Sequence, residues 1–456
     1  MDNLKVLKFG GTSVGTVESL RNVKAIVEGL DHPAIVVVSA LGGLTDKLIS
    51  TARLAAEGNP SYIEMMLGFR RRHEEIISGV VPENRIPEVS EKVNALLDEL
   101  EDRYKGLSLI RDLPERTLDE IVSFGERMSS VIVAAMLDNA THHNSLEFIK
   151  TEKWFSRNIA DRPLTERLIC EEFGSELSCH AVTGGFISTD RDSGEITNLG
   201  RGGSDYTAAL IAAALESEVL EIWTDVDGFL TADPRIIPEA GLIPEMTFIE
   251  SMELCSFGAK VIYPPTIYPV FHKNIPIRIL NTFNPSAPGT YICDSAGEHK
   301  GPRGVSSLNN TAVITLSGPL TDNVAEVNSR AYNAMARNGI SVFLVTQPSG
   351  GDSFSIAMPQ ADAQNALKYL ELEFASEMQT GEITEIMLTE GLSVVAVVGE
   401  GMKQMVGLGA RLVNTLLRSS IPVEALSEGA SDTTLAIVVD SENVKDALKL
   451  IHAACF

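Results

Sequence analysis

Short runs of apolar residues at the start of the chain alternate with segments of helical periodicity. Residues 4–9 form a strand-like run of apolar and basic side chains, and residues 17–29 show apolar positions spaced three and four apart. A glycine-rich turn at residues 10–15 separates them. Residues 34–39 form a continuous β-branched run, which is typical of a strand buried on both faces. This order of elements predicts a βαβ unit that opens an α/β sheet.

The segment from about residue 60 to 140 has a different pattern and predicts a helical insertion. Apolar residues recur there at three- and four-residue spacing between charged ones, as at Val93, Leu97 and Leu100. Strand-like runs return afterwards, at residues 181–188, 219–224 and 275–280. A Pro- and Gly-rich stretch then precedes a further strand and a polar segment, 294–303, which is a candidate linker.

The last third of the chain contains an internal repeat with an offset of about 80 residues. Residues 311–318 match 392–399, and residues 340–342 match 421–423. Each copy reads as strand, helix, two strands and helix, the order of a ferredoxin-like module. From these patterns we expect an α/β domain at 1–293, a linker at 294–307, and modules at 308–385 and 386–456.

The charge balance of the chain excludes several classes of function. Its 456 residues include 37 Lys and Arg against 62 Asp and Glu, a formal net charge of −25. A surface this acidic repels phosphate backbones and anionic lipids, so we expect neither nucleic acid nor membrane as a partner. No window approaches the roughly 18–20 apolar residues of a membrane span, and the N-terminus has no signal architecture. We therefore expect a cytoplasmic protein.

The cysteines and histidines indicate neither a disulfide framework nor a metal site. The five cysteines are odd in number and scattered without a CxxC pair, and the eight histidines form no HxxxH or HxH pattern. We interpret the cysteines as reduced, mostly buried thiols.

Two glycine-rich turns combine free backbone amides with cations. Lys8 precedes two glycines at the end of the first predicted strand, an arrangement that suits an anionic ligand. A second turn, 199–205, precedes an Ala-rich helix. It supplies Arg201, which can hold a carboxylate or phosphate, and Asp205, which can hold a metal or a cationic group. The alternatives are an ordinary tight turn, and a salt-bridged Arg201 with Asp205 as a helix N-cap.

Charged residues mark two further segments. Residues 221–229 read as a strand that runs into a polar turn, and Asp233 and Arg235 follow, as in a nucleotide site of an open α/β sheet. Asp227 and Gly228 are interpreted as a structural turn. Glu126 lies next to a predicted helix start, where it can face the ammonium group of a ligand; capping or an ion pair is the alternative.

Together these motifs closely resemble those of the aspartate kinase family. The matching segments are KFGGTSVG from Lys8, FGERMSS from Phe124, GRGGSDYTAA from Gly200, WTDVDG from Trp223, ADPR from Ala232 and FGAK ending at Lys260. They are collinear with that family over essentially the whole chain, and the C-terminal repeat resembles its paired ACT domains. The resemblance implies a three-layer α/β/α amino acid kinase domain with a helical insertion, followed by two β-α-β-β-α modules.

The resemblance also implies an activity and its residues. The family transfers the γ-phosphoryl group of ATP, which carries Mg²⁺, to the side-chain carboxylate of L-aspartate, giving 4-phospho-L-aspartate, the first step toward lysine, threonine, methionine and diaminopimelate. By the family pattern Lys8 contacts the transferring phosphate, and Asp205 orients the reacting centre and helps to organise Mg²⁺. The residues implied for aspartate are Thr12, Ser13, Ser39, Thr45, Glu126, Arg201 and Ser204. Those implied for the nucleotide are Lys8, Phe9, Gly10, Gly11, Thr224, Asp225, Phe229, Asp233, Arg235 and Lys260.

The implied chemistry agrees with the composition. Because a carboxylate nucleophile is already ionised at neutral pH, we expect no catalytic His or Cys. The cations that fall within the motifs locally reverse the acidity of the chain for two anionic substrates. Phe229 stands where the family often has tyrosine, which keeps stacking on the nucleotide and loses a phenol hydrogen bond.

The paired ACT domains imply feedback control by an end-product amino acid, threonine or lysine, and a homodimer or homotetramer formed through them. The contacts implied for that effector are Gly318, Asn323, Val324, Ile340, Thr346 and Gln347. The chain resembles the kinase half of fused aspartokinase–homoserine dehydrogenase enzymes, and we expect no room for a dehydrogenase before Phe456. Both a single-function enzyme and a trimmed bifunctional one stay open.

Two other functions remain as alternatives. One is another kinase of the same fold, acting on glutamate, acetylglutamate or UMP. The other is a catalytically weak protein that senses amino acids through its ACT pair.

Overall fold

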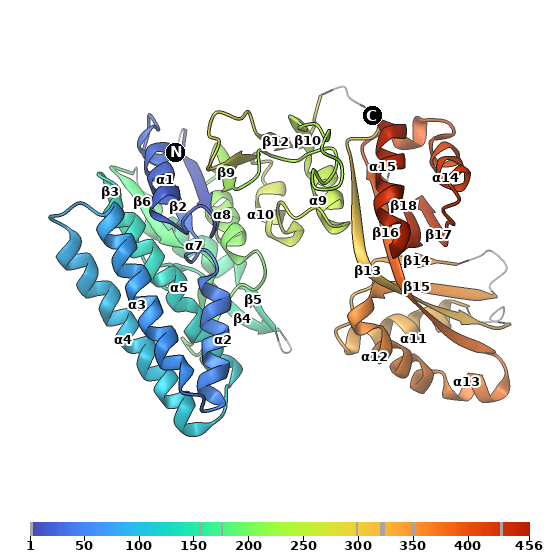
Figure 1. Cartoon of the computed structure of the whole chain (residues 1–456), viewed down its shortest axis with the longest axis horizontal. Coiled ribbons are helices and arrows are strands. Elements are labelled where there is room, and N and C mark those ends of the chain that lie inside the picture. Colours follow the sequence, from blue (N-terminus) through green and yellow to red (C-terminus); the bar gives the residue numbers. More distant parts are fainter. Residues whose placement is uncertain are drawn as a thin grey trace. The chain divides into compact units, whose positions relative to one another are not determined.

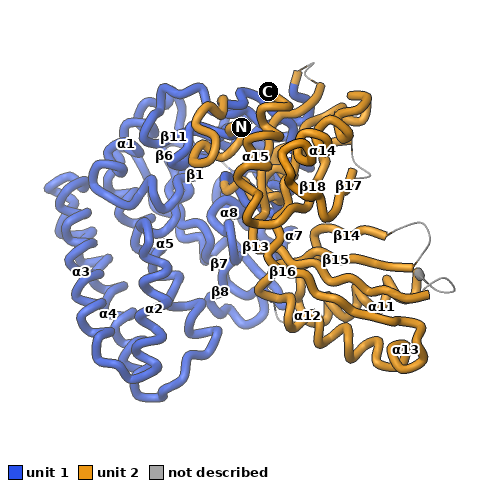
Figure 2. Tube along the Cα trace, turned by 45° about the vertical axis from the view of Figure 1, so that its right-hand side comes forward, with its two compact units in different colours: residues 1–229, 242–248, 261–296 blue, residues 230–241, 249–260, 297–456 orange. Residues whose placement is uncertain are grey.

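The chain divides into two compact units, which Figure 2 colours separately. The computed structural model describes residues 3–154, 157–174, 177–297, 300–319, 324–347, 352–428 and 432–456. The first unit comprises residues 1–229, 242–248 and 261–296, and the second comprises residues 230–241, 249–260 and 297–456.

An eight-stranded sheet forms the centre of the first unit (Figure 1). Its order is β10-β12-β11-β9-β1-β2-β6-β3, and the paired neighbours are parallel except β11 and β12. The strands are β1 (Lys5–Phe9), β2 (Ile35–Val38), β3 (Ala140–His143), β6 (His180–Gly184), β9 (Val219–Thr224), β10 (Glu245–Thr247), β11 (Ile277–Asn281) and β12 (Thr290–Cys293). All four residues of β2 are buried, which explains why its sequence is a continuous apolar run.

Helices pack on this sheet and connect its parallel strands. The main ones are α1 (Val17–Glu28), α5 (Glu115–Met136), α7 (Arg162–Phe173) and α8 (Gly203–Ala214). α5 packs along β2, β3 and β6, whereas α8 packs along β1, β2 and β9. α1 begins with a capping box between Thr16 and Ser19. The shorter elements are α6 (Ser145–Phe148), α9 (Phe248–Ser256), the 3₁₀ helix Pro264–Thr266 and α10 (Tyr268–Phe271). The predicted α/β kinase-type sheet is confirmed.

A small second sheet lies beside the main one in the first unit, with the order β5-β4-β7-β8. Its strands are β4 (Lys150–Trp154), β5 (Arg157–Ala160), β7 (Ile187–Asp190) and β8 (Ile196–Asn198). The run expected at 181–188 is therefore divided between two sheets, because the chain turns at Gly185 and Phe186.

The predicted helical insertion consists of long helices packed on one another (Figure 1). Within the predicted range of about 60–140 they are α3 (Ser61–Val80), α4 (Ile86–Ile110) and α5; α2 (Leu44–Ala56), which precedes that range, packs on all three. Val93, Leu97 and Leu100 of α4 are buried as their spacing predicts. Tyr104 is also fully buried, and its hydroxyl donates to Leu48 O (3.1 Å), which ties α4 to α2.

The second unit contains the two copies of the predicted β-α-β-β-α repeat. The first copy is β13 (Gly304–Ser317), α11 (Val324–Arg337), β14 (Leu344–Thr346), β15 (Ser353–Pro359) and α12 (Gln360–Glu373), and α13 (Ala375–Thr380) follows it. The second is β16 (Glu385–Val398), α14 (Leu408–Arg418), β17 (Ala425–Glu428), β18 (Thr434–Asp440) and α15 (Val444–Cys455), with 3₁₀ turns at Met402–Gln404 and Ser441–Asn443. Both copies contribute to one six-stranded sheet, ordered β14-β15-β13-β16-β18-β17.

The two repeats exchange strand halves within this sheet. Residues 304–308 of β13 pair with 394–398 of β16, next to β18 of the second copy. Residues 311–317 of β13 instead pair with β15 of the first copy on one side and with the start of β16 on the other. β13 and β16 therefore run through both copies, and β13 begins within the range expected as a linker.

Two expectations from composition can be compared with the structure. The interpretation of the cysteines as mostly buried is wrong: Cys170 is exposed, and Cys179, Cys255, Cys293 and Cys455 are partly exposed. Cys179 lies in a loop, Cys293 ends β12, and Cys170, Cys255 and Cys455 lie in the last turns of helices, where packing does not enclose them. Within the described ranges, none of the helices combines the length and apolar character needed to span a bilayer.

Candidate active site

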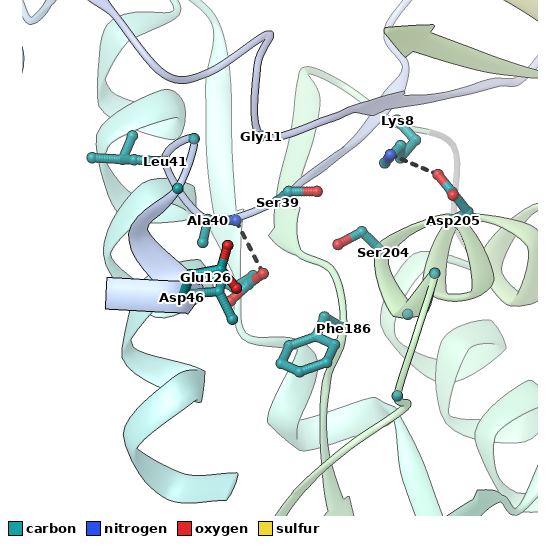
Figure 3. Close-up of a pocket in the computed structure, with 16 residues that line it drawn as sticks. Lys8, Gly11, Ser39, Ala40, Leu41, Asp46, Glu126, Phe186, Ser204 and Asp205 are labelled. Atoms are coloured by element: carbon teal, nitrogen blue, oxygen red, sulfur yellow. Dashed lines mark hydrogen bonds and ion pairs between the residues drawn. The ribbon is translucent and has the colours of Figure 1, made fainter. Parts of the chain in front are cut away.

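A cavity of about 350 Å³ opens at the carboxyl ends of the central strands of the first unit (Figure 3). It is lined by Lys8, Gly11, Ser39, Ala40, Leu41, Gly42, Gly43, Thr45, Asp46, Glu126, Phe186, Gly200, Gly202, Gly203, Ser204 and Asp205. This edge of an open parallel sheet is where such folds bind ligands. The structure thus brings together residues from three of the predicted motifs.

Lys8 and Asp205 form an ion pair at one end of this cavity (Figure 3). The Lys8 ammonium, near the end of β1, lies 2.6 Å from Asp205 Oδ1 in the first turn of α8. Their side chains are 11% and 13% exposed, so both remain accessible from the cavity. The expectation that Asp205 could be an N-cap is wrong, because Gly202 is the N-cap of α8.

Glu126 presents a buried carboxylate to the cavity. It lies in the middle of α5 rather than near a helix start, so the expected location and the capping alternative are both wrong. Ala40 N donates to Glu126 Oε1 (3.0 Å), while Oε2 is buried without a hydrogen-bond partner among the described residues. Burial raises the pKa of this carboxyl to about 8. An unpartnered acidic oxygen of this kind is suited to a cationic group of a ligand.

The turn that leads into α8 presents backbone amides to the cavity. Gly200 and Gly202 have φ values of 72° and 70°, a left-handed conformation that side-chain-bearing residues rarely adopt. The free N–H groups of the first turn and the helix dipole favour an anion at this point. Arg201 projects from the same turn, exposed, with its guanidinium 5.6 Å from the centre of the Tyr263 ring. No ion pair to Arg201 occurs in the part of the chain that the structure describes.

Comparison with known proteins agrees with this geometry. Residues 3–281, more than half of the chain, match the amino acid kinase family, and residues 395–455 match an ACT domain. The chain belongs to the amino acid kinase family. Its fold is an amino acid kinase domain followed by ACT domains.

Aspartokinases are among the similar proteins. The bifunctional aspartokinase/homoserine dehydrogenase of Haemophilus influenzae is 33% identical over 99% of this chain and 56% of its own length. Aspartokinase 2 of Arabidopsis thaliana is 28% identical over 99% of this chain and 84% of its own length. The structure of E. coli aspartokinase III with aspartate and ADP (R-state) superimposes with a TM-score of 0.83, at 28% identity and 99% coverage of both chains. The chain thus spans about half the length of the bifunctional relatives it matches.

Several residues predicted for this amino acid kinase site do not line the cavity. Thr12 is exposed, and Ser13 is fully buried, with its hydroxyl 2.7 Å from Thr282 Oγ1. Phe9 is buried and stacks on Trp223 with 5.9 Å between the ring centres. Gly10 is not among the lining residues either.

The residues predicted for the nucleotide are distributed between both units. Thr224, Asp225 and Phe229 belong to the first unit, and the Phe229 side chain is only 1% exposed. Asp233, Arg235 and Lys260 belong to the second. Arg235 Nη2 donates to Asp233 Oδ2 (2.7 Å) and its Nε to Oδ1 (2.9 Å), so this pair is already formed.

The effector residues predicted from the family are described only in part. Asn323 lies outside the described residues, and of Val324 the structure describes the backbone at the start of α11. Ile340 is 8% exposed and belongs to the core of the first repeat. Thr346 ends β14, and the neighbouring Gln347 accepts a hydrogen bond from Asn328 of α11 (2.8 Å). Gly318 lies directly after β13.

Three features of the cavity are absent from the sequence prediction. Phe186 borders it with a φ of 68°, unusual for a bulky residue. Gly42 approaches the Gly11 turn so closely that a Cβ there would lie 2.9 Å from Gly11 O. Arg72 of α3 holds both turns, since its Nη2 donates to Gly15 O (3.0 Å) and Gly42 O (2.9 Å). The Gly42–Gly43 pair after a buried strand was the one sequence signal that pointed here.

Proposed function

We propose that this chain is an aspartate kinase, which transfers the γ-phosphoryl group of ATP to the side-chain carboxylate of L-aspartate. The observation that carries the proposal is the unpartnered Oε2 of Glu126 in the same cavity as the Lys8–Asp205 pair. An amino acid substrate needs a carboxylate for its ammonium group, and a phosphoryl donor needs a cation. One cavity supplies both, and the similarity to aspartokinases supports aspartate as the amino acid.

The residues then act by positioning and by charge. Glu126 binds the ammonium group of aspartate, and Arg201 with the amides around Ser204 binds its α-carboxylate. The side-chain carboxylate is the nucleophile and is ionised at neutral pH, so no general base is required. Lys8 neutralises the charge of the phosphoryl group as it moves from ATP to that carboxylate. Ser39 and Thr45 complete the wall of the cavity beside the substrate.

The nucleotide site and its metal ion are further parts of the proposal. In the first unit, Thr224, Asp225 and Phe229 are the residues proposed to bind ATP. The carboxylate of Asp205 in the cavity fits Mg²⁺, which binds proteins through one or two carboxylates and otherwise through phosphates and water. When bound, the ion neutralises charge on the phosphates. Asp205 would hold it, since this carboxylate lies at the end of the cavity occupied by Lys8.

Regulation by an amino acid is proposed for the second unit. One structure of E. coli aspartokinase III contains lysine and aspartate (T-state), and its TM-score with this chain is 0.75 at 28% identity. We propose lysine or threonine as the effector here, bound near Gly318, Thr346 and Gln347, in a homodimer or homotetramer.

A substrate panel tests the activity. ADP formation is measured with ATP and Mg²⁺ and, separately, aspartate, glutamate, N-acetylglutamate and UMP as acceptors. Turnover of aspartate in clear preference to the others is expected. Preference for N-acetylglutamate or UMP would replace aspartate kinase by another reaction of the same fold. Amino-acid binding without any ATP turnover would instead identify a sensing protein.

A further inference from the structure

Asn198 links two elements of the first unit through both ends of its side-chain amide. Its Nδ2 donates to Asp119 Oδ1 of α5 (2.7 Å), and its Oδ1 accepts from Gly200 N (2.9 Å). Asn198 is the last residue of β8, and Gly200 begins the turn that lines the cavity. The chain of contacts therefore runs from α5 through Asn198 to the backbone of the Gly200–Gly203 turn.

The chemistry of the two partners fixes which way the amide points. An ionised carboxylate can only accept, and a backbone N–H can only donate. Asn198 must therefore turn its NH₂ group toward Asp119 and its oxygen toward Gly200. A flipped amide would lose both bonds, so these two contacts fix the orientation of the Asn198 side chain between α5 and the turn.

The same helix carries Glu126, seven residues or about 10 Å further along its axis. Glu126 is the group proposed to bind the ammonium of aspartate, and the Gly200–Gly203 turn is proposed to bind its α-carboxylate through Arg201 and the α8 amides. α5 thus supports both sides of the cavity. A second tie between α5 and the segment before β8, Arg116 Nη1 to Glu195 Oε1 (2.7 Å), is exposed and lies away from the turn.

We propose that Asp119 and Asn198 are positioning residues that set the distance between the Gly200–Gly203 turn and Glu126, and with it the affinity for the amino acid substrate. The kinetic part of this inference rests on the proposed function. The structural part concerns the position of the turn in the substrate-free protein and is independent of the proposed function.

The kinetic test uses a pair of single variants and an exchanged pair. Asn198→Ala and Asp119→Ala are expected to raise KM for aspartate about tenfold and to leave KM for ATP within twofold. The double variant D119N/N198D rebuilds an amide–carboxylate pair with an acceptor for Gly200 N, so it is expected to recover most of the loss. Asn158→Ala is the matched control, because Asn158 Nδ2 reaches Asp119 Oδ2 (3.4 Å) without contacting the turn.

Hydrogen exchange of the substrate-free protein supplies a readout independent of activity. Asn198→Ala is expected to increase exchange of the amides from Gly200 to Asp205, while exchange in β1 and β2 stays at the wild-type level. Unchanged exchange and unchanged KM values would overturn the inference, as would equal rises in both KM values with a lowered Tm. If the wild-type protein does not phosphorylate aspartate, the proposed function fails, and the exchange result alone decides for or against the positioning of the turn.

Discussion

The ammonium group of Lys8 and the carboxylate of Asp205 lie 2.6 Å apart, although the two residues are 197 positions (205 − 8) apart in the sequence. The contact joins the end of β1 to the first turn of α8, a helix that no side chain caps at its N-terminus. In a chain with a net charge of −25, this pair keeps a cation at the point where a phosphoryl group is proposed to bind. An anionic ligand would compete with Asp205 for Lys8, so the pair also holds the lysine ready before substrate arrives.

Replacing Lys8 separates its catalytic role from its structural one. Lys8→Met keeps the apolar stem and removes the charge, and we expect kcat to fall about a hundredfold or more, the scale of one preorganised charge contact. It should also lower stability by about 2 kcal/mol, because Asp205 is left without its partner. The double variant K8M/D205N should recover stability and remain inactive. Recovery of kcat in the double variant would show that Lys8 serves only to neutralise Asp205.

Glu126 predicts a pH dependence for the use of aspartate. Burial raises its pKa to about 8, so in the free protein the carboxyl is neutral below that pH and attracts the ammonium group weakly. We expect kcat/KM for aspartate to rise with pH up to about 8. Glu126→Gln should lower kcat/KM for aspartate about 30-fold, which corresponds to the loss of one hydrogen bond to a charged group. It should also remove the increase of kcat/KM with pH. Initial rates from pH 6 to 9 check this, with exposed Glu64→Gln as the control. A wild-type rise that persists in E126Q would contradict the assignment.

The same residue predicts a pH dependence of stability. Folding raises the pKa of the Glu126 carboxyl from 4.5 to about 8, so the folded state binds this proton more tightly than the unfolded chain does. The contribution of Glu126 to stability is therefore most favourable at low pH, where the carboxyl is protonated in both states. As pH rises from about 4.5 to 8, the unfolded chain ionises while buried Glu126 stays protonated, so the native state loses stability. We therefore expect Tm of Glu126→Gln to match the wild type near pH 5 and to exceed it at pH 8. An equal difference at both pH values would show that the change comes from packing alone.

The local spacing of apolar residues predicted much of the fold because this spacing depends directly on which side chains are buried. The β-branched run of β2 is buried on both faces, and the stripe of Val93, Leu97 and Leu100 faces the helical core. The repeat was visible because its two copies place equivalent apolar residues about 80 positions apart. The strand exchange between β13 and β16 was not, since it depends on pairing between residues far apart in sequence.

The sequence predicted those site residues that lie beside glycines and charges at strand ends. It did not predict the residues whose place in the site depends on tertiary packing. Lys8, Ser39, Thr45, Ser204 and Asp205 do line one cavity. Glu126 was expected near a helix start, yet it lies in the middle of α5, and the nearby Ser129 and Ser130 are buried and donate to backbone carbonyls. Phe186 and Arg72 carry no local signal, because a left-handed phenylalanine and an arginine that bonds two turns are properties of the folded chain.

Gly185 is predicted to be necessary because of a close approach between two elements of the site. A Cβ at this position would lie 2.7 Å from Cα and Cβ of Ser204, at the start of α8. Gly185→Ala should therefore displace that end of α8, lower stability by about 1–3 kcal/mol, and reduce kcat/KM for aspartate at least tenfold. Gly68→Ala in α3 has open space and should stabilise slightly through helix propensity. Thermal unfolding and kinetics of both variants decide, and wild-type behaviour of G185A would contradict the role of the α8 terminus.

A substitution in the second unit is expected to weaken inhibition by the effector and to leave the kinase activity unchanged. Gln347 follows β14 and accepts a hydrogen bond from Asn328 of α11 (2.8 Å), so it fixes one strand end against a helix of the first repeat. If the effector binds beside this strand end, Gln347→Ala should raise the concentration needed for half inhibition about tenfold and leave uninhibited kcat unchanged. Rates with lysine, threonine and methionine, singly and in pairs, measure this. Gln364→Ala, exposed on α12, is the control, and inhibition of Q347A at the wild-type concentration would place the effector elsewhere.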